Sequence, residues 1–383
     1  MVAISLLLKV VDASSEQETE LLSVDNRALT KLQAEQVATQ LWQAEQTRIQ
    51  EELGAMWESR EVTYNGYSMP FTVKVYGNEP ANGRSLYISM HGGGNVPKEV
   101  NDQQYRNQIG LYSPKEGVYI APRAAVDDWN MWFRPHVDTL FKRIIQCAIL
   151  KLNVNPNRVY LLGYSAGGDG TYRMAPRLAD QWAAASMMAG HPGEASPKNL
   201  RNIGFMVWMG EHDSAYNRNI LAVDFGKRMD SLQAEDSEGY IHKTTIVPGC
   251  GHWMNRADTA AIEWLSQFER NPYPKRIVWR QEGSNLRSTF YNLEVDINSA
   301  SEGSELVVEY SDNTISILKS DYNRVVIYLN DSIMDLSKPV TVECNGNTIF
   351  HGKVKRTSQV IANSISLFQD PCYIYSAKVE VTK

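Results

Sequence analysis

The sequence predicts an α/β protein whose mostly parallel sheet is preceded by a helical segment and followed by a separate domain of β-strands. Between about residues 85 and 268, short apolar runs alternate with helical patterns, as in a sheet whose strands are buried on both faces. Beyond residue 271 the segments are all strand-like. The length of 383 residues also favours more than one domain.

Composition and charge narrow the function classes. Hydrophobic residues make up 43% of the chain and charged residues 21%, as in a globular protein. The 38 basic and 44 acidic residues give a net charge of −6, which offers no basic surface for nucleic acid. The apolar run at residues 2–8 is far shorter than the roughly 20 residues of a membrane span. We therefore expect no membrane insertion, and we recognise no signal peptide.

The first part of the chain predicts a helix and then a hairpin. Residues 26–52 are mostly helix formers and predict one long surface helix. Residues 61–64 and 71–76 flank Asn65-Gly66, a pair that favours the tight turn of a β-hairpin. Buried strands are expected at 85–90, 117–121, 158–162, 183–188, 204–209 and 244–247. Helices are expected at 137–152, 171–180, 217–232 and 259–268.

The pattern changes at residues 271–274, where the sequence is Asn-Pro-Tyr-Pro. The strands expected beyond it are rich in Val, Ile, Tyr and Thr and lie at 276–280, 288–295, 306–310, 314–318, 325–329, 340–344 and 377–381. They predict a small β-sandwich without a chemical constellation of its own. The expected division is a helical extension at 1–58, an α/β domain at 59–270 and the β-sandwich at 271–383.

A catalytic serine is indicated where the strand at 158–162 meets the next helix. The sequence at 163–167 is Gly-Tyr-Ser-Ala-Gly, which matches the G-x-S-x-G of a nucleophile elbow. Such a turn needs glycines because side chains beside the serine would collide with neighbouring backbone. We therefore expect the Ser165 hydroxyl to project from the edge of the sheet as a nucleophile.

A second motif predicts the groups that stabilise negative charge. The strand at 85–90 ends in His91-Gly-Gly-Gly, which matches the H-G-G-G loop of lipases and esterases. The backbone amides of Gly93 and Ala166, helped by Gly94, are expected to form an oxyanion hole.

At these two motifs the sequence resembles the α/β-hydrolase superfamily, and more closely its esterase, polyester-depolymerase and feruloyl-esterase branch. The resemblance covers residues 61–270. It implies an eight-stranded, mostly parallel sheet, with nucleophile, acid and base in that order along the chain. Relatives with appended modules are often exported, which slightly favours a periplasmic or secreted location.

The chain order that the resemblance implies assigns the other two members of a triad. The strand at 204–210 ends in Glu211-His212-Asp213; Asp213 fits the acid best and Glu211 is the alternative. Of the seven histidines, four precede the acid, His351 lies in the β domain and His242 begins a strand. His252, in a loop after a strand, is therefore the expected base.

Specificity is expected from loops at the carboxyl ends of the strands. The residues assigned to substrate binding are His91, Tyr164, Trp129, Trp132, His191 and Trp253, with Asp169 and His191 also possible supports of the triad. Aromatic rings there suit sugar or aromatic ester groups.

These residues predict a serine hydrolase that cleaves carboxylic esters through an acyl-enzyme, without metal or cofactor. A carbohydrate-linked or other small acyl ester is the expected substrate. The four cysteines are too far apart for zinc-ligand spacing. Two alternatives remain open: a peptidase related to prolyl oligopeptidases, and a non-catalytic binding protein on the same scaffold. The former usually carry an N-terminal propeller, which about 60 residues cannot build.

Overall fold

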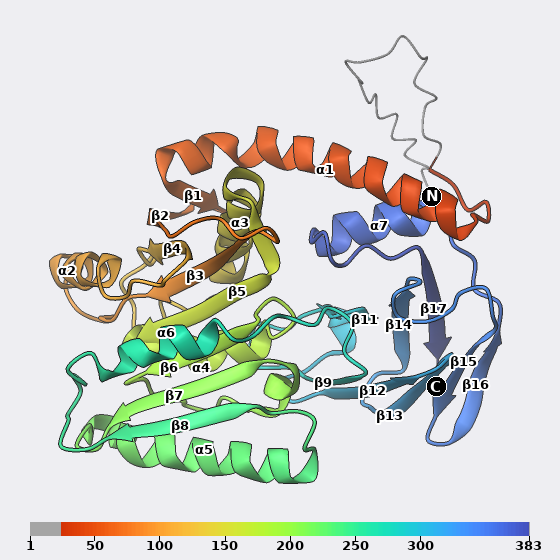
Figure 1. Cartoon of the computed structure of the whole chain (residues 1–383). Coiled ribbons are helices and arrows are strands. Elements are labelled where there is room, and N and C mark those ends of the chain that lie inside the picture. Colours follow the sequence, from red (N-terminus) through yellow and green to blue (C-terminus); the bar gives the residue numbers. More distant parts are fainter. Residues whose placement is uncertain (1–23, 383) are drawn as a thin grey trace. The chain divides into compact units, whose positions relative to one another are not determined.

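The computed structural model describes residues 24–382 (Figure 1). The chain divides into two units, an α/β unit of residues 53–287 and 301–304, and a β unit of the described residues up to 52 with 288–300 and the chain from 305. In this division residues 53–58 and 271–287 group with the α/β unit, and the described part of the expected helical extension up to residue 52 groups with the β unit. The apolar run at residues 2–8 lies outside the described residues.

The α/β unit is built on an eight-stranded sheet, as expected. Its order is β1-β2-β4-β3-β5-β6-β7-β8. The pairs β1–β2 and β2–β4 are antiparallel and the other neighbours run parallel. The strands are β1 (Glu61–Tyr64), β2 (Tyr67–Tyr76), β3 (Arg84–Met90), β4 (Gly117–Pro122), β5 (Val154–Tyr164), β6 (Ala184–Met188), β7 (Gly204–Gly210) and β8 (His242–Val247).

Local sequence explains the start of this sheet. Asn65 and Gly66 both have positive φ, 48° and 79°, which is the conformation that a two-residue hairpin turn requires and that Asn-Gly adopts readily. Nearly all residues of β3, β4, β6 and β7 are buried, in agreement with their continuous apolar sequences.

Helices flank the sheet (Figure 1). They are α2 (Lys98–Ile109), α3 (Pro135–Leu152), α4 (Ala166–Arg177), α5 (Arg218–Glu235) and α6 (Ala260–Leu265), with short 3-10 turns η1 (Lys198–Asn202), η2 (Ala215–Asn217) and η3 (Ala257–Thr259). The sequence did not predict α2, because its polar residues give little apolar periodicity. Strand β9 (Arg276–Arg280) follows α6 in this unit, where its Arg280 N–H donates to the Asn199 side chain of η1 at 2.6 Å.

The β unit contains two groups of strands. One sheet has the order β10-β11-β14-β17 and antiparallel pairing, with β10 (Thr289–Phe290), β11 (Leu293–Val295), β14 (Arg324–Leu329) and β17 (Ala377–Thr382). In the other group β16 (Asn347–Gly352) pairs with β15 (Val340–Cys344), β15 with β13 (Thr314–Ser320), and β13 with β12 (Glu305–Ser311); β13 and β15 run parallel.

Three features of the β unit differ from the expected strands. The single strand predicted at 288–295 is a hairpin of two short strands, β10 and β11. Strand β16 and helix α7 (Ser358–Phe368) were not predicted. Thr357 is the N-cap of helix α7, and its hydroxyl accepts the N–H of Val360, which satisfies one of the first amides of the helix.

The long N-terminal helix α1 (Lys31–Ser59) begins and ends later than the predicted 26–52. In the β unit, its Ala34 and Leu41 pack with Ile361 and Ile365 of α7. Within residues 24–382, no helix combines the length and apolar composition that crossing a bilayer requires.

Candidate active site

Ser165 lies on a sharp turn between β5 and α4. Its backbone has φ 57° and ψ −119°, a strained conformation for a residue with a side chain. Neighbouring glycines permit the turn: a Cβ at Gly163 would lie 2.1 Å from the Gly167 carbonyl oxygen, and one at Gly167 would lie 2.2 Å from that of Met90. The segment therefore has the strand-turn-helix geometry of a nucleophile elbow.

Ser165, His252 and Asp213 form a continuous series of hydrogen bonds. The Nε2 atom of His252 lies 2.9 Å from Ser165 Oγ, and its Nδ1 lies 2.7 Å from Asp213 Oδ2. An ionised carboxylate can only accept hydrogen bonds, so Nδ1–H of His252 donates to Asp213. The other nitrogen, Nε2, then carries no proton and accepts a hydrogen bond from the Ser165 hydroxyl. Asp213 is 3% exposed, which protects this bond from water.

Two loops bring the aspartate and the histidine to Ser165. Asp213 follows β7, and His252 follows β8. Glu211, the alternative acid, instead accepts the backbone N–H of Gly249 at 2.8 Å. Glu211 thus links the loop after β7 to the loop that carries His252, and Asp213 is the carboxylate that bonds to the imidazole.

The glycine loop after β3 contains Gly93 and Gly94, whose backbone N–H groups differ in their hydrogen bonding. Both have positive φ, 107° and 79°. The Gly94 N–H donates to Asn101 Oδ1 at 2.8 Å, and a Cβ at Gly93 would lie 2.2 Å from that same oxygen. The prediction that Gly94 is an oxyanion donor is therefore wrong, because its N–H already donates to Asn101.

Two amides remain as candidate oxyanion donors. The Gly93 N–H donates to no acceptor among residues 24–382. Ala166 begins α4, and the first amides of a helix have no partner within it. Asn101, which fixes the loop, was missed by the sequence analysis because it lies on the unpredicted helix α2.

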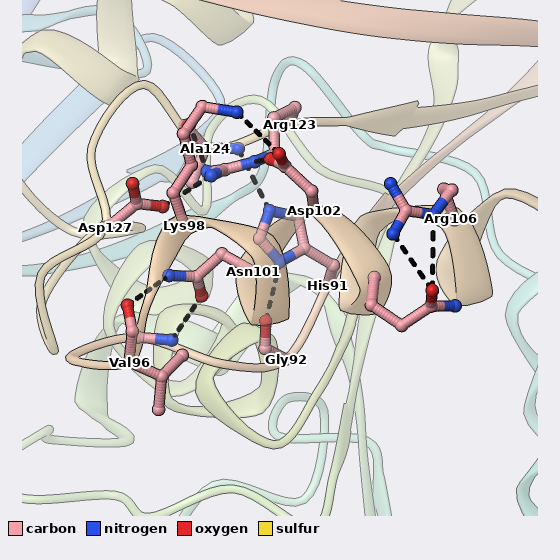
Figure 2. A network of polar contacts seen from close by, with 12 residues as sticks. His91, Gly92, Val96, Lys98, Asn101, Asp102, Arg106, Arg123, Ala124 and Asp127 are labelled. Atoms are coloured by element: carbon pink, nitrogen blue, oxygen red, sulfur yellow. Dashed lines mark hydrogen bonds and ion pairs between the residues drawn. The ribbon is translucent and has the colours of Figure 1, made fainter.

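His91 and Trp132 were expected in the substrate pocket, but both are completely buried at 0% exposure. The Nδ1–H of His91 donates to the carbonyl oxygen of Gly92 at 2.6 Å, and its Nε2 accepts the Ala124 N–H at 3.1 Å (Figure 2). Trp132 Nε1–H donates to the His91 carbonyl oxygen at 2.9 Å. Burial lowers the pKa of His91 to about 4. Because neither side chain is exposed, the prediction that they line the substrate pocket is wrong, and both instead bond to the glycine loop or the segment after β4.

Arg123 joins the segments around this loop. Its Nε donates to Asp102 Oδ1 at 2.9 Å and its Nη1 to the Ala124 carbonyl oxygen at 2.8 Å (Figure 2). Hydrogen bonds from Lys98 and Arg123 lower the pKa of Asp102 to about 2. Helix α2 is thus tied to the segment after β4 by charge-assisted hydrogen bonds.

Tyr164 is buried, and its hydroxyl bonds within the protein. It donates to the His252 carbonyl oxygen at 2.7 Å and accepts the Met254 N–H at 3.1 Å. These bonds make Tyr164 a support of the histidine loop, and its contact with a substrate stays a prediction. Trp253 and Trp129, in contrast, are 49% and 62% exposed. Of the expected pocket aromatics, these two present their rings to solvent.

Asp169 and His191 lie together beside the elbow. Asp169 Oδ1 accepts the His191 N–H at 2.6 Å, and His191 Nδ1 accepts the Gly193 N–H at 2.9 Å. Burial raises the pKa of the Asp169 carboxyl group, and the His191 hydrogen bond opposes the rise. Within this network, Asp169 orders the loop after β6.

No protein-family model matches the sequence, and the search of curated proteins found no match. Among solved structures, the chain is similar to a thermostable esterase at 19% identity and a TM-score of 0.40, over 55% of this chain and 62% of that chain. It thus spans less than two thirds of that relative. It is also similar to a ferulic acid esterase, at 17% identity and a TM-score of 0.40, over 54% of this chain and 96% of that one.

A third similar structure is fluorophosphonate-binding serine hydrolase F of Staphylococcus aureus, at 13% identity and a TM-score of 0.38, over 54% of this chain and 96% of that one. The strand order of the sheet, the elbow after β5 and the chain order of serine, aspartate and histidine give this unit the α/β-hydrolase fold.

Proposed function

We propose that the protein is a serine hydrolase that cleaves carboxylic esters through Ser165, His252 and Asp213. One observation carries the proposal: Ser165 Oγ, on a strained elbow, lies 2.9 Å from an imidazole whose other nitrogen lies 2.7 Å from a buried carboxylate. That geometry activates a hydroxyl nucleophile. A carbohydrate-linked or other small acyl ester is the proposed substrate class, since exposed tryptophans at this site suit ring-shaped groups.

The acylation step follows from these contacts. His252 Nε2 takes the Ser165 hydroxyl proton as the oxygen attacks the ester carbonyl, which gives a tetrahedral intermediate with a negative oxygen. The amides of Gly93 and Ala166 donate to that oxygen. Asp213 stabilises the imidazolium and holds its orientation. The imidazolium then protonates the leaving alcohol, and the acyl group stays on Ser165.

Deacylation repeats the steps with water. His252 takes a proton from water, the hydroxide attacks the acyl-enzyme carbonyl, and the proton returns to Ser165 as the acid leaves. Both half-reactions use the same base and the same oxyanion donors.

Turnover of p-nitrophenyl butyrate tests the proposal. We expect hydrolysis by the native protein and a loss of rate on the order of 10⁴- to 10⁶-fold in Ser165→Ala. The control is Ser231→Ala on α5, which should leave the rate unchanged. The native Ser231 hydroxyl donates to the Lys227 carbonyl oxygen of the same helix. Equal rates in native protein and Ser165→Ala would overturn the proposal. Hydrolysis of peptide p-nitroanilides but not of esters would favour a peptidase instead.

A further inference from the structure

Arg173 has no hydrogen-bond acceptor or ion-pair partner among residues 24–382, although its side chain is half-buried. It lies on α4, and its guanidinium carbon lies 5.6 Å from the ring centroid of Phe133. The backbone of Gly193 lies against it, since a Cβ added there would be 2.1 Å from Nη2 of Arg173. The five N–H donors of a guanidinium are therefore held in a fixed place with no acceptor from the described chain.

Several buried arginines of the same unit have carboxylate partners. Arg177, one turn further along α4, pairs with Asp138 at 2.6 Å. Burial raises the pKa of Glu282, and the charges of Arg280 and Arg173 oppose the rise, but the ion-pair partner of Glu282 is Arg280, at 2.8 Å. A half-buried charge without a partner is costly, and stacking on an aromatic ring offsets only part of the cost.

An exposed ring continues the same surface. Trp129 is 62% exposed, and its ring centroid lies 5.4 Å from that of Phe133 at an interplanar angle of 69°. Trp129, Phe133 and Arg173 thus form a row of two apolar rings and one planar cation, which we call the Arg173 row. Aromatic faces bind flat or ring-shaped groups, and a guanidinium binds a carboxylate through two parallel hydrogen bonds.

One end of the Arg173 row borders the candidate oxyanion loop. A Cβ at Gly94 would lie 3.3 Å from Trp129 Cα and 3.6 Å from the Cβ of Ala166. Ala166 is the residue next to Ser165 whose amide is proposed to stabilise the oxyanion. The Trp129 end of the row is therefore adjacent to the reacting centre.

The other end is connected to the elbow through the loop after β6. Gly193, which contacts Arg173, donates its N–H to His191 Nδ1, and His191 donates its own N–H to Asp169. Arg173 follows Ser165 by eight positions, and eight residues of α-helix span about 12 Å along the axis. The guanidinium lies at the loop that Asp169 and His191 order, where it is placed to bind a group of the substrate other than the reacting carbonyl.

We propose that the Arg173 row is a subsite for a carboxylate that the substrate carries in addition to its ester bond. The substrate class would be esters of acidic sugars or of other ring compounds that bear an additional carboxylate. This inference rests on the proposed esterase function and specifies its substrate.

Two matched pairs of esters test the subsite. The first is the mono-p-nitrophenyl ester of decanedioic acid, and the same ester with a terminal primary amide in place of the free carboxylate. The second places the charge on the alcohol side, as butyrate esters of 10-hydroxydecanoic acid and of its amide. For at least one pair, we expect the native protein to favour the carboxylate in kcat/KM on the order of ten-fold. This preference should weaken as salt is raised.

Substitutions of Arg173 test whether its charge causes the preference for the carboxylate-bearing ester. Arg173→Gln should reduce the ratio of kcat/KM values to near one, and Arg173→Lys should give an intermediate ratio, because lysine keeps the charge but loses the planar fork. The matched control is Arg106→Gln on α2, an exposed arginine that bonds to Gln103, which should keep the native ratio. Phe133→Leu should lower the ratio, since the ring that orients the guanidinium is lost.

The outcomes separate this inference from the proposed function. If the amide-capped esters are hydrolysed in a Ser165-dependent way but neither pair shows a preference for the carboxylate, the subsite is overturned and the esterase stands. A preference that persists in Arg173→Gln also overturns it. If no ester is hydrolysed by the native protein, the proposed function itself fails.

Discussion

The hydroxyl of Tyr164 donates a hydrogen bond to the carbonyl oxygen of His252 at 2.7 Å. Tyr164 directly precedes Ser165, so the residue before the candidate nucleophile holds the backbone of the candidate base. The same hydroxyl accepts the N–H of Met254. One buried side chain thereby fixes the distance between the elbow and the histidine loop.

We predict that Tyr164→Phe lowers kcat for p-nitrophenyl butyrate on the order of ten-fold, with little change in KM. The change leaves a buried amide and carbonyl unpaired, so His252 loses its fixed position relative to Ser165. Tyr160→Phe is the control, because Tyr160 lies on the same strand and donates to the Phe268 carbonyl oxygen at 2.8 Å. It should lose stability but keep kcat; equal losses of kcat in both variants would show that Tyr164 has no positioning role.

Asn101→Ala should lower kcat about ten- to a hundred-fold with a smaller effect on KM. Asn101 Oδ1 accepts the Gly94 N–H, and its Nδ2–H donates to the Val96 carbonyl oxygen at 3.1 Å, so its loss frees the loop that presents Gly93. Gln108→Ala on the same helix removes a buried bond to Ser89 and serves as the control for stability. Steady-state kinetics of both variants checks the prediction, and an unchanged kcat in Asn101→Ala contradicts it.

The buried His91 should make stability depend on pH. Burial lowers the pKa of His91 to about 4, whereas an unfolded histidine titrates near 6.5. Between pH 4 and 6.5 the unfolded chain binds more protons than the folded protein. The contribution of His91 to the free energy of unfolding is therefore fully present above pH 6.5 and falls by about 3 kcal/mol as the pH drops to about 4.

Urea unfolding at pH 7 and pH 4.5 measures that contribution. His91→Gln should lower the free energy of unfolding at pH 7, because the packing is perturbed, but its decrease between the two pH values should be smaller than that of the native protein. The same decrease in both proteins would mean that His91 does not titrate as described.

Gly163→Ala should destabilise the α/β unit by about 3 kcal/mol or more, because the added Cβ would lie 2.1 Å from backbone that cannot easily move. Gly110 offers the comparison: it ends α2 and an added Cβ there meets no atom within 4 Å. Gly110→Ala should change the free energy of unfolding by less than about 1 kcal/mol. Thermal melts of the two variants check the difference, and similar melting temperatures contradict it.

Local patterns predicted the sheet and the elbow because their causes are local. Glycines at 163 and 167 are required by the turn itself, and the buried strands consist of continuous apolar residues. The hairpin followed from Asn65-Gly66, a pair whose backbone preference matches the turn.

The remaining features depend on tertiary packing, which the sequence does not display. Trp129 and Trp132 lie three positions apart, yet one is 62% exposed and the other 0%, and no periodic pattern in that loop distinguishes them. Asn101 lies on a helix with a polar sequence, so neither the helix nor its contact with Gly94 was predictable. Arg173 was missed because a cation without a partner can be identified only when its neighbours are known.

Covalent labelling tests the central claim most directly. A fluorophosphonate should phosphonylate Ser165, as located by tandem mass spectrometry of the labelled peptide, because only an activated serine attacks such a reagent at an appreciable rate. Labelling should be abolished in Ser165→Ala and strongly slowed in His252→Ala. Absence of labelling in the native protein, or a label on another residue with Ser165 unmodified, would contradict the assignment of Ser165, His252 and Asp213 as a catalytic triad.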